Sequence, residues 1–258
     1  MQFYLGTDMP GWLWKHDIPL FVSHRRLDRF VNLKPALSEW CLDSGGFTEL
    51  STYGRWTTTA KDYIAAIRRY QDGIGKLNWA APQDAMCEPW ILEKSKAWLG
   101  GTVEAHQRWT VDNFLTLREL APDIPFIPVL QGWRLADYLR IVDMYEKAGV
   151  DLASYPTVGI GSVCRRQATE EIAQILGELS AFDLKMHGFG VKAAGIGLYG
   201  WLLHSADSMA WSYGGRFIKP CPHKGVASCA HCFDHAMSWR ADVLAASTSR
   251  GVQLSMSF

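Results

Sequence analysis

Short apolar runs alternate along the chain with stretches of helical periodicity. The runs end in polar or glycine residues and predict strands at 3–6, 19–23, 40–44, 78–84, 126–131, 157–162, 185–190 and, more weakly, 204–209. Between most of them, apolar residues spaced three or four apart predict helices. The clearest helical stretches are 59–71, 102–120, 135–148, 169–179 and 229–246. In 135–148, the residues Leu135, Tyr138, Leu139, Val142 and Tyr145 share one face, which we expect to be buried.

Strands that alternate with helices pair in parallel through right-handed crossovers. About eight such units in 258 residues predict an α/β protein with a (β/α)8 barrel of the TIM type. An open doubly wound sheet is the alternative. The sequence has no long linker and no low-complexity tract, so we expect one domain over residues 1–258. A cysteine-rich segment at 216–240 forms a small subdomain within it.

Polar residues recur where the predicted strands end. They are Asp43, Asp84, Gln131, Ser162 and Asp207. One aspartate in such a place is commonly a turn residue or a helix N-cap. Catalytic residues of a barrel, however, lie at the C-terminal ends of its strands. Three aspartates at different strand ends therefore favour an active site at one mouth of the barrel.

Composition and charge exclude several classes of protein to which the chain could belong. The chain is 48% apolar and 20% charged, as in ordinary globular proteins. The 26 Lys and Arg residues balance 26 Asp and Glu residues, which argues against a general polycation. Three local basic sets remain as candidate phosphate contacts: 24–26 (HRR), 165–166 (RR) and 216–224. No apolar run reaches membrane-spanning length and no signal peptide is evident, so we expect a cytoplasmic protein without a membrane partner.

The cysteines indicate a metal site in a reducing compartment. Three of the six cysteines crowd into twelve residues, close to His223, His231 and His235. Cys229 and Cys232 form a C-x-x-C pair that we expect to open a helix. With Cys221 and His223 they complete a tetrahedral zinc set, and His235 is the substitute for His223. A closed set of four ligands leaves no open position, so the zinc is expected to be structural.

No organic cofactor is expected. The segment 195–200 (GIGLYG) satisfies the G-x-G-x-x-G pattern of dinucleotide-binding proteins. That site also needs an acidic residue about 20 positions later, and the sequence holds no Asp or Glu from 208 to 233. We interpret these glycines as loop residues.

Five motifs in order resemble the tRNA-guanine transglycosylases. Segment 42–47 (LDSGGF) resembles the DSGG[FY] motif of that family, and Asp207 falls where the family places its nucleophile. The other matches are 128–132 (PVLQG), 158–162 (VGIGS) and 189–192 (FGVK, one Gly short). The sequence is most similar to one branch, the deazapurine DNA-modification transglycosylases called DpdA, which occur in phages and bacterial islands. The segments that carry this likeness are 12–14, 19–27, 208–212 and 238–240.

The resemblance implies a pentosyltransferase that exchanges guanine in DNA for a 7-deazaguanine such as preQ0. Asp207 attacks C1′ to give a covalent sugar ester, and Asp43 shuttles the proton. Asp84 reads the donor edge of the base. The resemblance implies further contacts to the base. Gln131 and the backbone around Gly161 and Ser162 contact O6, and the rings of Phe47 and Phe189 contact the faces of the base. Attack on C1′ needs a flipped or single-stranded guanine.

The sequence departs from the tRNA enzymes in two places. A Cys follows the base-reading Asp after one residue in that family, whereas here Cys87 follows Asp84 after three. Cys87 and the neighbouring Glu88 are therefore either pocket residues or scaffold. The zinc spacing also differs. Two further functions stay open: a tRNA-guanine transglycosylase, and a non-catalytic nucleic-acid-binding barrel subunit. Accessory modification proteins are candidate partners, in a bacterial or phage-infected cell.

Overall fold

Eight parallel strands form one curled sheet in the computed structural model, which describes residues 1–164, 166, 169–223 and 227–255. The strand order is β4-β3-β2-β1-β8-β7-β6-β5, so the first and last strands of the chain pair with each other. All eight predicted strands are confirmed. Their bounds are β1 Gln2–Thr7, β2 Leu20–Ser23, β3 Trp40–Asp43, β4 Leu77–Ala80, β5 Val129–Leu130, β6 Val158–Ile160, β7 Met186–Gly188 and β8 Ser205–Ser208.

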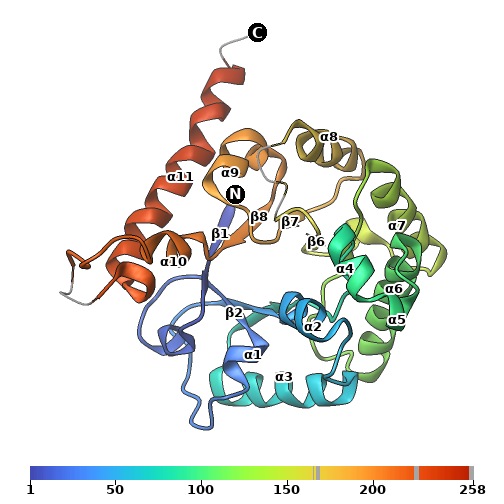
Figure 1. Ribbon diagram of the computed structural model, residues 1–258, viewed down its shortest axis with the longest axis horizontal. Helices are drawn as coiled ribbons and strands as arrows, with labels where there is room; N and C mark the ends of the chain where they lie inside the picture. Colours follow the sequence, from blue (N-terminus) through green and yellow to red (C-terminus); the bar gives the residue numbers. More distant parts are fainter. Residues whose placement is uncertain (165, 167–168, 224–226, 256–258) are drawn as a thin grey trace.

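Helices surround this sheet (Figure 1). The five predicted helices are present as α3 (Ala60–Ile74), α6 (Val103–Leu120), α7 (Leu135–Lys147), α8 (Glu170–Leu179) and α11 (Phe233–Ser255). The threonine N-caps Thr59, Thr102 and Thr169 each accept a backbone N–H of the first turn, which fixes where three of them begin. Shorter helices that the periodicity did not predict are α1 (His24–Leu27), α2 (Gly46–Tyr53), α4 (Pro89–Lys94), α5 (Lys96–Leu99), α9 (Ala193–Tyr199) and α10 (Ala210–Gly215).

The two edges of the sheet approach each other at a single point. Ala80, the last residue of β4, forms a parallel bridge with Phe126, which precedes β5. Its N–H donates to the Pro125 carbonyl at 3.0 Å, and its carbonyl accepts from Ile127 at 3.2 Å. Within the described residues, β4 and β5 themselves share no ladder. The α/β class is confirmed, with an eight-stranded sheet curled into a half-barrel.

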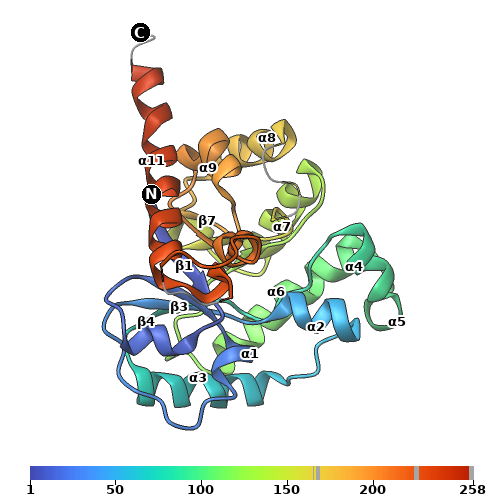
Figure 2. The same cartoon turned by 60° about the vertical axis from the view of Figure 1, so that its left-hand side comes forward.

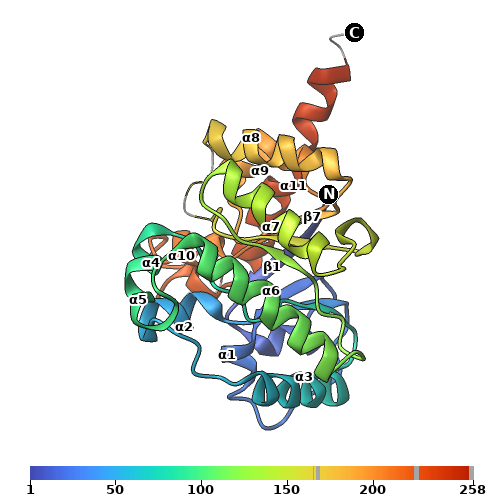
Figure 3. The same ribbon diagram turned by 90° about the vertical axis from the view of Figure 1, so that its right-hand side faces the viewer.

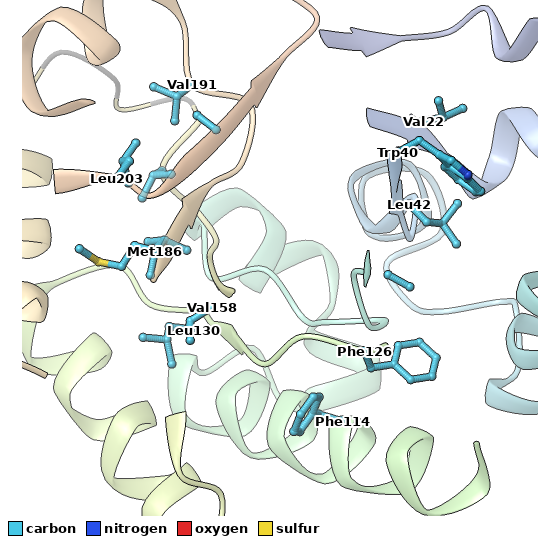
Figure 4. Close-up of a cluster of buried hydrophobic side chains, with 14 of the residues drawn as sticks. Val22, Trp40, Leu42, Phe114, Phe126, Leu130, Val158, Met186, Val191 and Leu203 are labelled. Carbon is cyan, nitrogen blue, oxygen red and sulfur yellow. The ribbon is translucent and has the colours of Figure 1, made fainter. Parts of the chain in front are cut away.

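Strand alternation divides the core into an outer and an inner layer. Alternate strand residues such as Val22, Leu42 and Val158 pack toward the surrounding helices (Figure 4). The intervening residues fill the inside of the curled sheet; they are Tyr4, Phe21, Cys41 and Trp79, joined by Ala81 and Ile127. Because side chains alternate along a strand, Asp43 lies on the same inner side as Cys41. Asp207 pairs with Tyr4 in the register of β1 and β8 and shares that side.

Two local predictions were wrong. Gly195 and Gly197 lie inside α9 rather than in a loop. Cys229 lies in a 3₁₀ turn, η5 (Cys229–His231), and α11 begins only at Phe233. The C-x-x-C pair therefore precedes the helix instead of opening it. Figure 2 shows the last turns of α11 projecting beyond the neighbouring helices.

The short helices gather at one end of the sheet. β1 starts at the N-terminus, and Figure 3 shows α2, α4, α5 and α10 on the opposite side of the molecule. The C-terminal ends of the parallel strands point to that side, so this end is the mouth of the curled sheet. Among the described residues, no helix combines the length and apolar character needed to span a bilayer.

Candidate active site and metal centre

A cavity of about 350 Å³ opens at the C-terminal ends of the strands. Every predicted catalytic and substrate-binding residue lines it: Asp43, Phe47, Asp84, Gln131, Gly161, Ser162, Phe189 and Asp207. The lining also includes residues that sequence reasoning missed, among them Thr7, Phe21, Ser23, Met86, Cys164 and Met209. Most of these missed residues are apolar or small, so their residue types carry no chemical signal.

Asp43 ends β3 and is half-buried in the cavity wall. Burial raises the pKa of its carboxyl group, and the charge of Asp207 adds to the rise. The Gly45 N–H and the Ser23 hydroxyl lower that pKa but do not offset the burial. Gly45 itself has φ 84°, a left-handed conformation that favours glycine, and it turns the chain from β3 into α2.

Asp207 lies in β8 and is only 6% exposed. Its Oδ1 accepts the Gly190 N–H at 2.9 Å, and the His187 Nε2 is 3.4 Å from the same oxygen. His187 is fully buried, with its Nδ1 at 2.9 Å from the Ser205 Oγ. Sequence reasoning missed His187, although a histidine inside the apolar run 185–190 was a signal that could have found it.

The base-reading candidates form one hydrogen-bonded group. The Gln131 side-chain NH₂ donates to the Asp84 carboxylate, and its Oε1 is 2.7 Å from the Ser162 hydroxyl. Burial raises the pKa of Asp84 to about 7, and the nearby carboxylates Asp43 and Glu88 add to the rise. A Cβ at Gly161 would be 2.2 Å from the Gln131 Nε2. Glycine at 161 therefore gives the Gln131 amide its space.

Cys87 and Glu88 support this group from behind. Both are buried, and neither is among the residues that line the cavity. The Cys87 N–H donates to the Ser162 Oγ at 2.8 Å, and that hydroxyl is 2.9 Å from the Glu88 Oε2. In the described structure the two residues are scaffold for Ser162 rather than pocket residues.

Two aromatic rings occupy opposite depths of the cavity. Phe47 stands at the mouth, 43% exposed, with its ring edge-on to Trp90 at 6.0 Å. Phe189 lies deeper and packs against the inner core; its ring is 4.8 Å from that of His187.

Two residues of the first predicted basic set are engaged within the protein. His24 is buried, its Nδ1 is 2.9 Å from the Tyr70 hydroxyl, and burial lowers its pKa. Arg25 forms an ion pair with the buried Glu49. The prediction that His24 contacts phosphate is therefore wrong.

The other two basic sets differ from each other. Arg166 is 3.1 Å from Glu171 and lies over the Trp133 ring, so its charge is partly neutralised. Arg216 and Lys219 are exposed and have no acidic partner within the described part of the chain. Arg165 and Lys224, which belong to the predicted sets, lie outside the described residues.

The four predicted metal ligands converge. Ligand atoms of Cys221, His223, Cys229 and Cys232 all lie within 4.8 Å of one another. The Cys221 and Cys229 sulfurs are 2.8 Å apart, and the His223 Nδ1 is 3.7 Å from each. His235 instead places its Nε2 at 3.3 Å from the Trp211 carbonyl, so it is not in the cluster. Three thiols and one imidazole are the donor set that zinc prefers, and the cluster can hold such an ion.

The metal cluster is packed against the helix that follows the Asp207 strand. A Cβ at Gly215, the end of α10, would be 2.5 Å from the Cys229 carbonyl. Trp211 of α10 stacks on Trp12 at 5.3 Å and donates its indole N–H to the Gly6 carbonyl at 2.8 Å. Since Gly6 lines the cavity, the cluster and the cavity are joined through α10.

Comparisons with known proteins bear on both sites. A search of the curated proteins finds no match. A family model described as "DpdA: DeoxyPurine in DNA protein A" matches residues 1–255. The matched range contains all the cavity residues and all four cluster residues.

Proposed function

Because the chain belongs to the DpdA family of DNA-modifying transglycosylase-type enzymes, we propose that it exchanges guanine in DNA for a 7-deazaguanine such as preQ0. The observation that carries this proposal is the meeting of three carboxyl groups, Asp43, Asp84 and Asp207, in one cavity of about 350 Å³. Base exchange needs a nucleophile, a proton carrier and an acceptor for the donor edge of the base. Three carboxyl groups in different surroundings supply these roles.

Asp207 is the nucleophile in this proposal. Its carboxylate bonds to C1′ while the C1′–N9 bond breaks, and the electron pair leaves with the purine. Asp43 gives the departing purine a proton, which the raised pKa of its carboxyl group supports. In the second half, the Asp43 carboxylate takes the N9 proton of the incoming base. That base attacks C1′ and releases Asp207, so configuration is retained after two inversions.

Asp84, Gln131 and the 161–162 backbone select the base. The N1–H and 2-amino groups of guanine and of preQ0 are donors, so an ionised Asp84 accepts them. Donors near Gly161 and Ser162, together with the Gln131 amide, face O6. Phe47 and Phe189 enclose the ring, and a single strand or a flipped nucleotide brings the base into the cavity.

The remaining proposals concern the metal site, the fold and the cellular location. The cluster of Cys221, His223, Cys229 and Cys232 binds one structural zinc within a segment at 216–240, and no organic cofactor takes part. The bridge between Ala80 and Phe126 supports closure of the sheet into a (β/α)8 barrel, with residues 1–258 as one domain. The protein acts in the cytoplasm of a bacterial or phage-infected cell, with accessory modification proteins as partners.

Trapping of the covalent intermediate tests the reaction. Without an incoming base, labelled guanine-containing DNA should give a protein–DNA adduct on a denaturing gel. Asp207→Ala and Asp207→Asn should abolish the adduct and the exchange, because no nucleophile remains. Asp43→Ala should slow adduct formation by roughly 10²- to 10⁴-fold, because it removes only the acid.

The substrate class is tested in the same assay. Labelled tRNA runs beside the DNA, and nucleoside mass spectrometry after addition of preQ0 reports exchange. An adduct with tRNA alone would identify a tRNA-guanine transglycosylase. Binding without any adduct would identify a non-catalytic subunit, and an adduct formed by Asp207→Ala would overturn the nucleophile assignment.

A further inference from the structure

Helix α10, which directly follows β8 (Figure 1), has one buried and one exposed side. Trp211, Ser212 and Gly215 are buried against the body of the protein. Met209 just before the helix, Tyr213 within it and Phe217 just after it are 40%, 64% and 72% exposed. The Tyr213 and Phe217 rings are 5.4 Å apart. We call Met209, Tyr213 and Phe217 the aromatic row.

The aromatic row begins at the cavity. Met209 lines the cavity and is also exposed, so the row leads from the mouth outward. The helix beneath it is held firmly, because Trp211 stacks on Trp12 and Gly215 abuts Cys229. The exposed rings therefore sit on a rigid support beside the place where the target base enters.

Two cations accompany the aromatic row. The Arg216 guanidinium lies 5.9 Å from the centre of the Tyr213 ring, and Lys219 is exposed two residues after Phe217. The sequence from 208 to 233 contains no Asp or Glu, although the whole chain has no net charge. Exposed rings interleaved with cations and free of acids are suited to a polyanion with planar groups.

We propose that the aromatic row binds single-stranded DNA, stacking the unpaired bases next to the target guanine while Arg216 and Lys219 contact their phosphates. The identity of the nucleic acid rests on the proposed function. The single-stranded form follows from the chemistry of the row. A duplex buries the faces of its bases against one another, whereas flat exposed rings bind bases whose faces are free.

Binding of a fluorescently labelled short oligonucleotide, followed by anisotropy, tests this proposal without requiring turnover. The double variant Tyr213→Ala/Phe217→Ala should bind the single strand at least about tenfold more weakly than the wild type. Tyr213→Trp should keep the affinity, because it keeps a stacking face. Arg216→Gln should lower the salt dependence of binding by roughly 0.7 in log–log slope, the value for one phosphate contact on a single strand.

The matched control is Phe182→Ala. Phe182 is also an exposed aromatic residue, but it lies in η3 (Ser180–Phe182), which precedes β7 at the opposite end of the sheet. It should leave the affinity unchanged. The proposal is overturned if the double variant binds the single strand like the wild type, or if Phe182→Ala weakens it equally. It is also overturned if the double variant loses only duplex DNA or only RNA. If base exchange is observed but the double variant binds single-stranded DNA like the wild type, this proposal alone fails. If the aromatic row binds single-stranded DNA but no base exchange is observed, only the proposed function fails.

A second, independent observation concerns His187. Ser205 Oγ lies 2.9 Å from its Nδ1, and a serine hydroxyl that donates there leaves the ring proton on Nε2. Nε2 is 3.4 Å from Asp207 Oδ1, the oxygen that also accepts the Gly190 N–H. The Gly190 N–H therefore donates to Oδ1, and the His187 Nε2 lies near the same oxygen without forming a hydrogen bond in the described structure.

We infer that Ser205 and His187 position the nucleophile, leaving Asp207 Oδ2 to attack C1′. The inference rests on the proposed role of Asp207. When the sugar ester breaks in the second half of the reaction, negative charge returns to Asp207, and the His187 and Gly190 donors stabilise it on Oδ1. His187 touches no substrate atom, so it is a positioning residue.

The separate effects on kcat and on KM distinguish this role from a merely structural one. His187→Phe keeps a ring among the inner aromatic residues but removes the donor. It should lower kcat by about 10²-fold with an unchanged KM for DNA. The other groups that face Asp207 are Asp43 and Cys41 of β3 and Tyr4 of β1, and none of them is altered.

His24→Phe is the matched control, since it removes another buried histidine hydrogen bond outside the cavity. Its kcat should stay unchanged. A folded His187→Phe with unchanged kcat would overturn the inference, as would a loss confined to KM. Should His187→Phe not fold, Ser205→Ala decides, because it frees the tautomer and should lower kcat by less, again with an unchanged KM. An adduct formed by Asp207→Ala would instead sink the nucleophile assignment.

Discussion

Three carboxyl groups line one cavity, yet each has different hydrogen-bond partners. Asp207 accepts the Gly190 N–H and has the His187 Nε2 at 3.4 Å from the same oxygen, whereas Asp84 is held by the Gln131 amide. Burial raises the pKa of Asp43 and of Asp84. The charge of Asp207 raises the pKa of Asp43 further, and the charge of Asp43 raises that of Asp84. Different surroundings suit carboxyl groups to the different roles that the proposed reaction needs.

The pKa of Asp84 leads to a prediction about pH. Only the ionised carboxylate accepts both donors of a guanine-like base, and with a pKa of about 7 its ionised form decreases below neutrality. The affinity for preQ0, measured by calorimetry, should therefore fall about tenfold from about pH 8 to about pH 6. Asp84→Asn should bind weakly with a flat profile. A wild-type profile that is flat over this range would contradict the acceptor role.

Gly161 gives a second prediction at this scale. In Gly161→Ala the new methyl group would lie 2.2 Å from the Gln131 Nε2, so the amide must move away from Asp84. The KM for the incoming base should rise by about tenfold, since a buried hydrogen bond to a charged group is worth about 1.5–3 kcal/mol. Gly177→Ala in α8 is the control, because its methyl group would have open space. Equal kinetics of the two variants would show that the site tolerates displacement of Gln131.

Helices and strands set the position of the metal cluster relative to the cavity. The 3₁₀ turn η5 packs against α10, and α10 follows the strand that carries Asp207. We therefore expect a metal in the cluster to stabilise the segment after the Asp207 strand as well as its own loop. Because all four ligand positions come from the protein, such a metal would be a structural support for the mouth.

The metal content of single variants distinguishes the four metal ligands from the neighbouring His235. Cys229→Ala should lose the metal and lower the thermal midpoint, because metal bound only by the folded chain contributes folding free energy. His223→Gln should bind the metal more weakly. His235→Gln should keep one zinc per chain, because His235 contacts the Trp211 carbonyl instead. Elemental analysis after gel filtration measures this, and zinc loss in His235→Gln alone would contradict the assigned ligand set.

Helices and strands could be predicted from the sequence when their hydrophobic pattern was long or regular. The eight strands and five longer helices have apolar runs or sustained periodicity, and they were found. Helices α1, α5 and α10 have six residues or fewer, too short for a period to show. In α9, Gly195 abuts the Tyr199 ring, and packing overrides the weak helix propensity of glycine.

The candidate site was predictable as far as motifs identified its residues. Asp43, Asp84, Gln131 and Asp207 were found from strand ends and from family motifs. His187, Ser205 and Met209 were missed, since their roles depend on strand register and on which side of α10 is exposed. Glu49 was missed for a similar reason, because only the fold brings it to Arg25 and neutralises that arginine. Contacts between residues distant in sequence do not appear in any local pattern.

On the scale of the whole molecule, the curl of the sheet brings the site together. Residues from β3 near the start of the chain and from β8 near its end share the inner side, because β1 pairs with both β2 and β8. Helix α11 packs against α9, α10 and β1, which ties the segment after the metal cluster to the first strand. Loss of order at the metal cluster should therefore lower the stability of the whole chain.

This connectivity predicts that the chain unfolds as one cooperative unit that includes the metal segment. Calorimetry under reducing conditions should show a single thermal transition. Removal of the metal by a chelator should move the whole transition down, by about 2–4 °C for each kcal/mol of lost binding free energy in a chain of roughly this length. Zinc added back should restore the midpoint. Two separate transitions, of which only one responds to the chelator, would show instead that the segment at 216–240 folds independently of the sheet, and that Asp207 does not depend on the metal.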